Sequence, residues 1–226
     1  ISGAATAEVA EDGYVLFTGS GRLVVDSTIE NNGEIVFASA TSRLMGVGTF
    51  TNNSLVQGTG RIDIADTTNS STGVFRVSPG QAMRFTTSIA NNGRIEIQGG
   101  SFESPSLSNG TGSVLTMSGG ATLRMSPNAP SFNAGSMLIS GNADVYGDLT
   151  NDSGGVVRIG GGGTVNFFDD VINSGNFEIA GGSVAFFFGT LDPGTISGFG
   201  TVVIFGGLGP RIGHTDIGTD VSISES

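Results

Sequence analysis

A short motif recurs about every twenty residues along most of this chain. It reads apolar, any, Asn, one or two residues, Gly, any, apolar, any, apolar, and its clearest copies are Ile29–Phe37, Ile89–Ile97 and Val171–Ile179. From Gly33 to Gly175 the motif repeats over seven intervals, which gives a period of roughly 20 residues. At about 3.3 Å per residue, this length fits three short strands and three turns. The repeat therefore predicts one coil of a β-solenoid.

The predicted fold is all-β, a single right-handed parallel β-helix of about ten coils over residues 1–226. We expect residues 1–28 to form an N-terminal first coil or cap, 29–205 the repeats, and 206–226 an irregular C-terminal cap or pairing segment. An open solenoid end exposes unpaired backbone groups, so each end needs a cap or a second copy.

Apolar and polar residues alternate within each copy, and Ile95 and Ile97, for example, flank Glu96. Side chains alternate faces along a strand, so the apolar pair should point inward and the middle residue outward. In-register stacking then places Arg76 beside Glu96 and Arg158 beside Glu178.

A second inward strand is predicted to carry Val165 and Phe167 in one copy and Val184, Phe186 and Phe188 in the next. By that alternation Phe187 points outward, where a large apolar side chain can form a contact surface.

The asparagine recurs once per coil and is predicted to stack into a hydrogen-bonded ladder that supports the fold, formed by Asn31, Asn52, Asn91, Asn109, Asn151 and Asn173. Asn and Gly both tolerate positive φ, so the Asn-x-Gly step is expected to be a tight turn with a left-handed residue.

Composition excludes several classes of function. The net charge is −11, with 20 acidic and nine basic residues, and nucleic-acid binding requires clustered basic residues. The chain has no cysteine, so disulfides and thiolate metal sites are excluded. No apolar run is long enough to cross a membrane, and we expect no transmembrane segment and no cofactor.

Two alternatives involve carboxylates. Asp169 and Asp170 are the residues that could coordinate Ca²⁺ at a turn, and with Glu178 they form the densest acidic cluster for polysaccharide hydrolysis. Short uniform coils leave no long loops to wall a cleft, so a solvated turn is the preferred interpretation. The one histidine, His214, has no nucleophile motif beside it. We predict that the protein is not an enzyme.

The Asn-x-Gly-x-Ile-x-Ile unit, followed by Gly-Gly-x-Val-x-Phe, resembles the repeats of extracellular bacterial β-helix proteins, namely autotransporter passenger domains and filamentous-haemagglutinin-like adhesins. The resemblance covers roughly residues 20–205. It implies a secreted or cell-surface rod that serves in adhesion, a surface coat or a fibre.

Self-association into a homo-oligomer or homopolymer is the expected mode of assembly, through Phe187 and through Ile212, Val221 and Ile223 in the C-terminal segment. A glycan or another surface ligand is a further expected partner. The alternative function is that of a carbohydrate-binding or polysaccharide-cleaving β-helix, which a lateral groove lined by carboxylates and aromatic residues would indicate.

Overall fold

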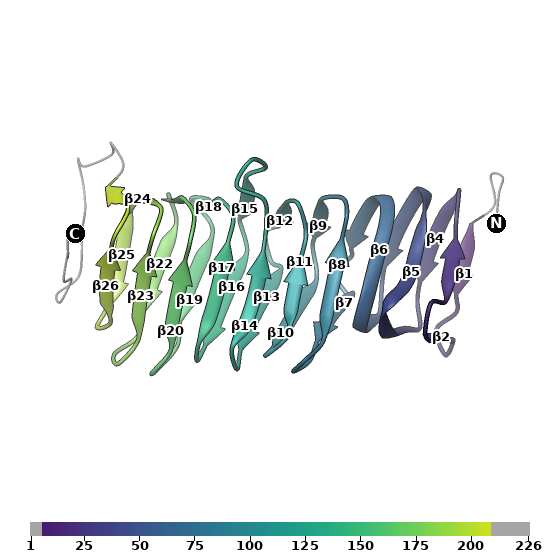
Figure 1. Cartoon of the computed structure of the whole chain (residues 1–226). Coiled ribbons are helices and arrows are strands. Elements are labelled where there is room, and N and C mark those ends of the chain that lie inside the picture. The colour runs from purple at the N-terminus through teal and green to yellow at the C-terminus, as the bar shows by residue number, and fades with distance from the viewer. Residues whose placement is uncertain (1–5, 209–226) are drawn as a thin grey trace.

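The computed structural model describes residues 6–208, which form a rod of stacked parallel coils (Figure 1). Each coil contributes one strand, or one part of a long strand, to each of three faces, and strands of neighbouring coils pair in parallel. The described residues contain strands and turns but no helix. The prediction of an all-β solenoid with about ten coils is therefore confirmed.

The first face is formed by β2 (Tyr14–Phe17), the starts of β5 (Glu34–Asn52) and β6 (Leu55–Asn69), β7 (Val74–Val77), β10 (Arg94–Gln98), β13 (Val114–Ser118), β16 (Ser136–Ser140), β19 (Val156–Ile159), β22 (Asn176–Ile179) and β25 (Thr195–Gly198).

The second face is formed by β3 (Arg22–Val24), the middle parts of β5 and β6, β8 (Ala82–Phe85), β11 (Ser101–Glu103), β14 (Ala121–Arg124), β17 (Ala143–Tyr146), β20 (Thr164–Phe167), β23 (Val184–Phe187) and β26 (Thr201–Ile204).

The third face is formed by β1 (Ala7–Val9), β4 (Thr28–Asn31), the ends of β5 and β6, β9 (Ile89–Asn91), β12 (Leu107–Asn109), β15 (Ser131–Asn133), β18 (Leu149–Asn151), β21 (Val171–Asn173), β24 (Thr190–Asp192) and β27 (Gly207–Leu208).

The coil is right-handed. In Figure 1 the second-face strands β20, β23 and β26 lie nearest the viewer and run upward, while the chain advances from right to left.

One loop interrupts the regular outline, between β14 and β15, and it stands out above the rod. Elsewhere the coils are short and uniform, so the surface is set mainly by the outward side chains of the strands.

Inward side chains from the three faces meet along the axis of the rod and form one continuous apolar core. Phe75 is fully buried, and its ring centroid lies 5.1 Å from that of Phe85 and 6.3 Å from that of Phe102. A narrow tube filled from three sides needs large side chains, which explains the phenylalanine content. Most phenylalanines are indeed core residues, namely Phe17, Phe37, Phe50, Phe75, Phe85, Phe102, Phe167, Phe177 and Phe187.

The predicted register of the first face is confirmed. Arg76 pairs with Glu96 across β7 and β10, with Nε and Oε2 2.6 Å apart. Arg158 pairs with Glu178 across β19 and β22, with Nη2 and Oε1 3.4 Å apart. Opposite charges therefore face each other on adjacent strands, as the period of the repeat requires.

The predicted orientation of Phe187 is wrong. Phe187 is fully buried and stacks on Phe167 with ring centroids 5.0 Å apart, while Phe188 is 42% exposed. The repeat suggested aligning Val184 with Val165, but the structure pairs Val184 with Thr164. A shift of one residue sends every side chain of a strand to the opposite face. Val184, Phe186 and Phe188 therefore point outward, not inward.

The glycine of the Asn-x-Gly step has a different role from the one predicted. None of Gly33, Gly93 and Gly175 adopts the left-handed conformation. Instead, a Cβ on Gly93 would lie 2.1 Å from the carbonyl oxygen of Ser70 in the preceding coil. The motif therefore requires glycine because neighbouring turns pack in close contact.

A ladder of buried asparagines runs along the third face. From Asn31 to Asn151, each Nδ2 donates to the Oδ1 of the asparagine one coil further on, over 2.7–2.8 Å, and the last, Asn173, donates to the carbonyl oxygen of Pro193. The ladder includes all six residues singled out from the sequence and two more, Asn69 and Asn133. Asn133 stands in an Asn-Ala-Gly step similar to the Asn-Ser-Gly step of Asn173, whereas three hydroxyl residues separate Asn69 from the next glycine and obscure the motif.

Candidate binding face

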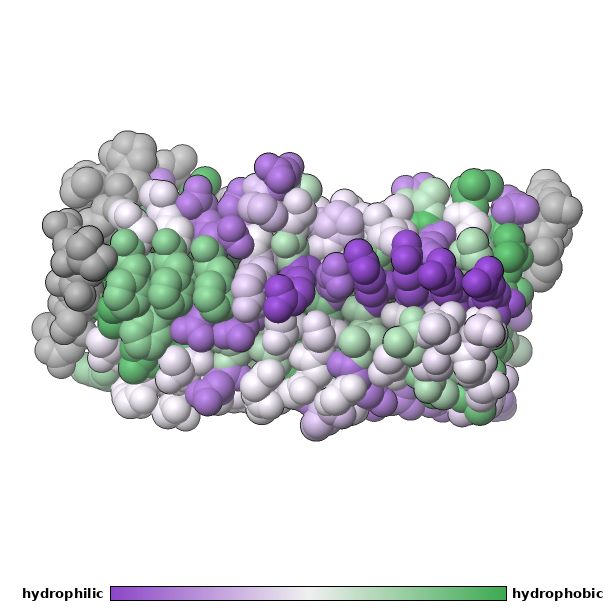
Figure 2. Space-filling model, in the orientation of Figure 1, coloured by the Kyte–Doolittle hydropathy of each residue, from purple (hydrophilic) through white to green (hydrophobic). Residues whose placement is uncertain are grey.

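One row of outward side chains follows the second face along the length of the rod. Strand pairing aligns its members one per coil, in the order Arg22, Arg43, Arg61, Arg84, Glu103, Arg124 and Tyr146. Backbone hydrogen bonds continue the alignment just beyond the strands through Phe168, Phe188 and Phe205. We call these ten residues the lateral row. Figure 2 shows its hydrophilic half and its hydrophobic half end to end on one face.

The N-terminal half of the lateral row concentrates positive charge. It holds five of the nine arginines of a chain whose net charge is −11. Two carboxylates accompany them within ion-pair distance. Asp63 pairs with Arg61 and lies 3.7 Å from Arg43, and Glu103 lies 3.4 Å from Arg84. Like charges on adjacent strands destabilise a sheet, so this row carries a cost that the fold alone does not require.

The C-terminal half of the row is a stack of aromatic rings. Tyr146 and Phe168 stack at 4.3 Å, Phe168 and Phe188 at 5.2 Å, and Phe188 and Phe205 at 5.1 Å, with interplanar angles of 8°, 9° and 11°. Phe186 joins the stack at 6.1 Å from Phe205. These five residues form what we call the aromatic strip. Each ring covers the face of its neighbour, so the strip presents ring edges to solvent.

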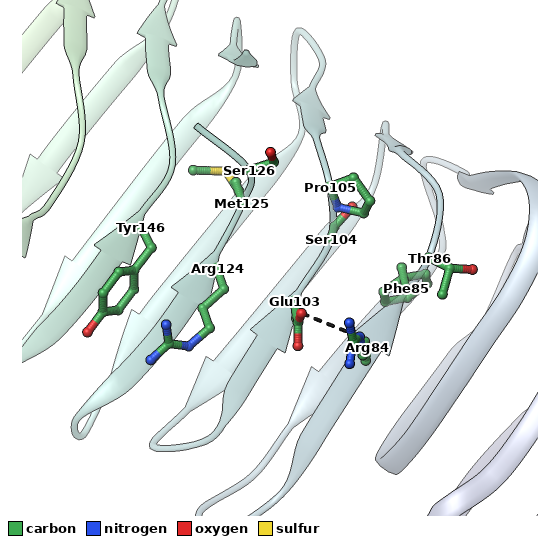
Figure 3. Close-up of a pocket in the computed structure, with 10 residues that line it drawn as sticks. All are labelled: Arg84, Phe85, Thr86, Glu103, Ser104, Pro105, Arg124, Met125, Ser126 and Tyr146. Carbon is green, nitrogen blue, oxygen red and sulfur yellow. Dashed lines mark ion pairs between the residues drawn. The ribbon is translucent and has the colours of Figure 1, made fainter. Parts of the chain in front are cut away.

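A shallow depression of about 510 Å³ lies where the two halves of the row meet. Figure 3 shows Arg84 paired with Glu103, and Arg124 pointing toward Tyr146. The guanidinium carbon of Arg124 lies 4.0 Å from the centroid of the Tyr146 ring, a cation–π contact. Pro105 and Ser126 close one side of the depression. Glu103 is the one carboxylate in its lining.

Asp169 and Asp170, the candidate calcium ligands, accept backbone hydrogen bonds in the turns between the second and third faces. Asp169 accepts a hydrogen bond from the backbone NH of Gly147 at 2.7 Å, and Asp170 accepts one from Thr190 at 2.7 Å. Within residues 6–208, no group of three or more His, Cys, Asp or Glu side chains is placed to hold a metal ion. Glu178 lies on the first face, away from these turns.

Asp148 belongs to the same cluster, and its pKa is raised above the ordinary value of 3.8 by desolvation and by the charges of Asp170 and Asp169. Because this pKa is higher in the folded than in the unfolded protein, ionisation of Asp148 destabilises the fold as the pH rises above the ordinary value. We therefore expect Asp148→Asn to melt at a higher temperature than the parent protein at neutral pH. The difference in melting temperature between Asp148→Asn and the parent protein should disappear at pH values below the ordinary pKa of an aspartate. Thermal melts across this range test it, with exposed Asp12→Asn as the control; equal differences at all pH values would contradict it.

The residues predicted for self-association are not brought together by the described structure. Phe187 lies in the core, as described above. Ile212, Val221 and Ile223 lie outside the described residues, as does His214. The lateral row escaped the sequence analysis, although Arg22, Arg43, Arg61 and Arg84 follow one another at about one period, which was a detectable signal.

The comparisons with known proteins yield no relative: no family model, curated protein or solved structure matches the chain. In the part of the chain that the structure describes, no helix has the length and apolarity needed to cross a bilayer.

Proposed function

We propose that this chain is an extracellular structural or adhesive rod that builds a surface fibre or coat by self-association, without catalysis. The observation that carries the proposal is the aromatic strip. Five adjacent aromatic side chains on the surface of a regular rod form the kind of exposed apolar patch that marks a protein–protein contact. The terminal segment with Ile212, Val221 and Ile223 is a second proposed contact.

The geometry of the strip favours self-association over recognition of neutral sugars. Sugar rings bind aromatic residues on the faces of the rings, and here those faces are covered by neighbouring rings. An apolar surface made of ring edges suits another apolar surface, and a second copy of the same strip provides one. The resemblance to cell-surface adhesins supports an extracellular setting.

Sedimentation velocity at rising protein concentration tests the proposal. We expect the sedimentation coefficient of the full chain to increase with concentration, and Phe188→Ser to abolish the increase. The matched control is Phe132→Ser on the third face, because Phe132 is 41% exposed and Phe188 is 42% exposed. A monomer at every concentration, or equal loss in both variants, contradicts the proposal.

A second candidate is carbohydrate binding or polysaccharide cleavage, and the depression at Arg84, Glu103 and Arg124 is the observation that favours it. Glycoside hydrolysis commonly uses two carboxylates flanking the scissile bond, and this lining supplies one, already paired with Arg84. We therefore propose binding without cleavage at this site. Size-exclusion profiles of acidic and neutral polysaccharides after incubation with the protein test this, and shortened chains would contradict it.

A further inference from the structure

We infer that the arginine half of the lateral row binds a linear acidic polysaccharide that carries a carboxylate on successive sugars. The inference concerns a different surface from the aromatic strip. It takes its extracellular setting from the proposed function and names the ligand class of the second candidate, because Arg84 and Arg124 also line the depression described above. Its basis is the alignment of Arg22, Arg43, Arg61, Arg84 and Arg124 along one line of the rod.

Charge is the first argument. The line carries five guanidinium groups, with the carboxylate of Glu103 on it and that of Asp63 beside it, in a protein that is otherwise strongly acidic. Exposed charges more than about 8–10 Å apart are largely screened at physiological salt, so a ligand lying on this line is attracted by the arginines more than it is repelled by the remaining carboxylates. An anionic chain would also relieve the repulsion between neighbouring arginines.

Chemistry and spacing are the second argument. Arginine presents a planar pair of donors that matches a carboxylate in a bidentate contact. Adjacent coils are about 4.8 Å apart, which is close to the length of one sugar unit in an extended polysaccharide. A chain of uronic acids therefore offers its carboxylates at nearly the repeat of the arginines. The side chains of Arg43 and Arg84 are 36% and 56% exposed, so a ligand can reach both guanidinium groups beside their carboxylate partners.

A nucleic acid fits this surface less well. The phosphates of each strand of duplex DNA are about 3.4 Å apart along the axis, a shorter repeat than that of the coils. Single strands bind by stacking bases on aromatic faces, and in the adjoining strip Tyr146, Phe168 and Phe188 cover one another's faces.

The experiment measures binding of the full chain to immobilised polygalacturonate, with dextran as the neutral polymer and single-stranded DNA as the competing polyanion. We expect binding to polygalacturonate that weakens with added salt, and none to dextran. Arg43→Gln/Arg84→Gln should weaken it about tenfold, because each exposed ion pair contributes a few-fold. Glu103→Gln should strengthen it about threefold, because it removes a carboxylate that competes for Arg84.

The matched control is Arg158→Gln. Arg158 is also 56% exposed and is also 3.4 Å from a glutamate, but it lies on the first face. The inference is overturned if Arg158→Gln weakens binding as much as Arg84→Gln, if Glu103→Gln weakens it, if dextran binds equally, or if DNA binds while polygalacturonate does not. Sedimentation of Arg43→Gln/Arg84→Gln separates the two proposals, because loss of polysaccharide binding with normal self-association affects this inference alone.

Discussion

Replacing Phe75 with alanine is expected to destabilise the rod by about 3–5 kcal/mol, the range for removing a large aromatic side chain from a core. Phe75 is fully buried and contacts the rings of Phe50, Phe85 and Phe102, which come from three different coils. In a solenoid each coil is stabilised mainly by its neighbours, so a cavity here weakens the interfaces on both sides. Chemical denaturation followed by circular dichroism measures the loss.

The control for Phe75→Ala is Phe199→Ala, because Phe199 is 78% exposed. We expect that change to stay within about 0.5 kcal/mol of the parent protein. Phe75→Leu should fall between the two, since it leaves a smaller cavity. Equal stability of Phe75→Ala and Phe199→Ala would show that the packing described for the core is incorrect.

The second large effect is expected at the centre of the asparagine ladder. Asn91 is fully buried, accepts from Asn69 at 2.7 Å and donates to Asn109 at 2.7 Å. Asn91→Ala removes both bonds and leaves polar groups of the neighbouring rungs without those partners in the interior. We expect a loss of about 3 kcal/mol, because each unsatisfied buried group costs about 1–3 kcal/mol. Denaturation midpoints measure this loss as well.

Two further variants sharpen the test of the ladder. Asn91→Asp keeps the size of the side chain but cannot donate to Asn109 when ionised and buries a charge, so its loss should be at least as large. Asn92→Ala changes the exposed neighbouring residue and should be nearly neutral. If Asn92→Ala were as destabilising as Asn91→Ala, the ladder would have no specific role.

Most of the fold was predictable because a periodic sequence constrains every coil at once. The Asn-x-Gly period fixed which strands pair, and so it placed Arg76 beside Glu96 correctly. The second face was harder, because the turns before its strands differ in length or in the position of their glycines. The turns before Thr164 and Val184 are equally long, but the Gly-Gly pair stands one position earlier in the second, and aligning these glycines shifted Val184 by one residue and reversed the expected orientation of Phe187.

The candidate binding face was less predictable than the fold for a physical reason. The members of the lateral row have different side chains, from Arg22 to Phe205, so no motif repeats along it. Its members lie on one line only because the strand register aligns residues about 20 positions apart in the sequence. The period alone places the arginines near that line, but the alternation of the second face decides that they point outward. That alternation was the part of the sequence most easily misread.

The most direct test of self-association through the aromatic strip is negative-stain electron microscopy of the purified full chain at increasing concentration. The account predicts isolated rods at low concentration and rods lying side by side, as pairs or bundles, at high concentration. Isolated rods at every concentration would contradict it, and rods joined only at their tips would contradict the role of the aromatic strip.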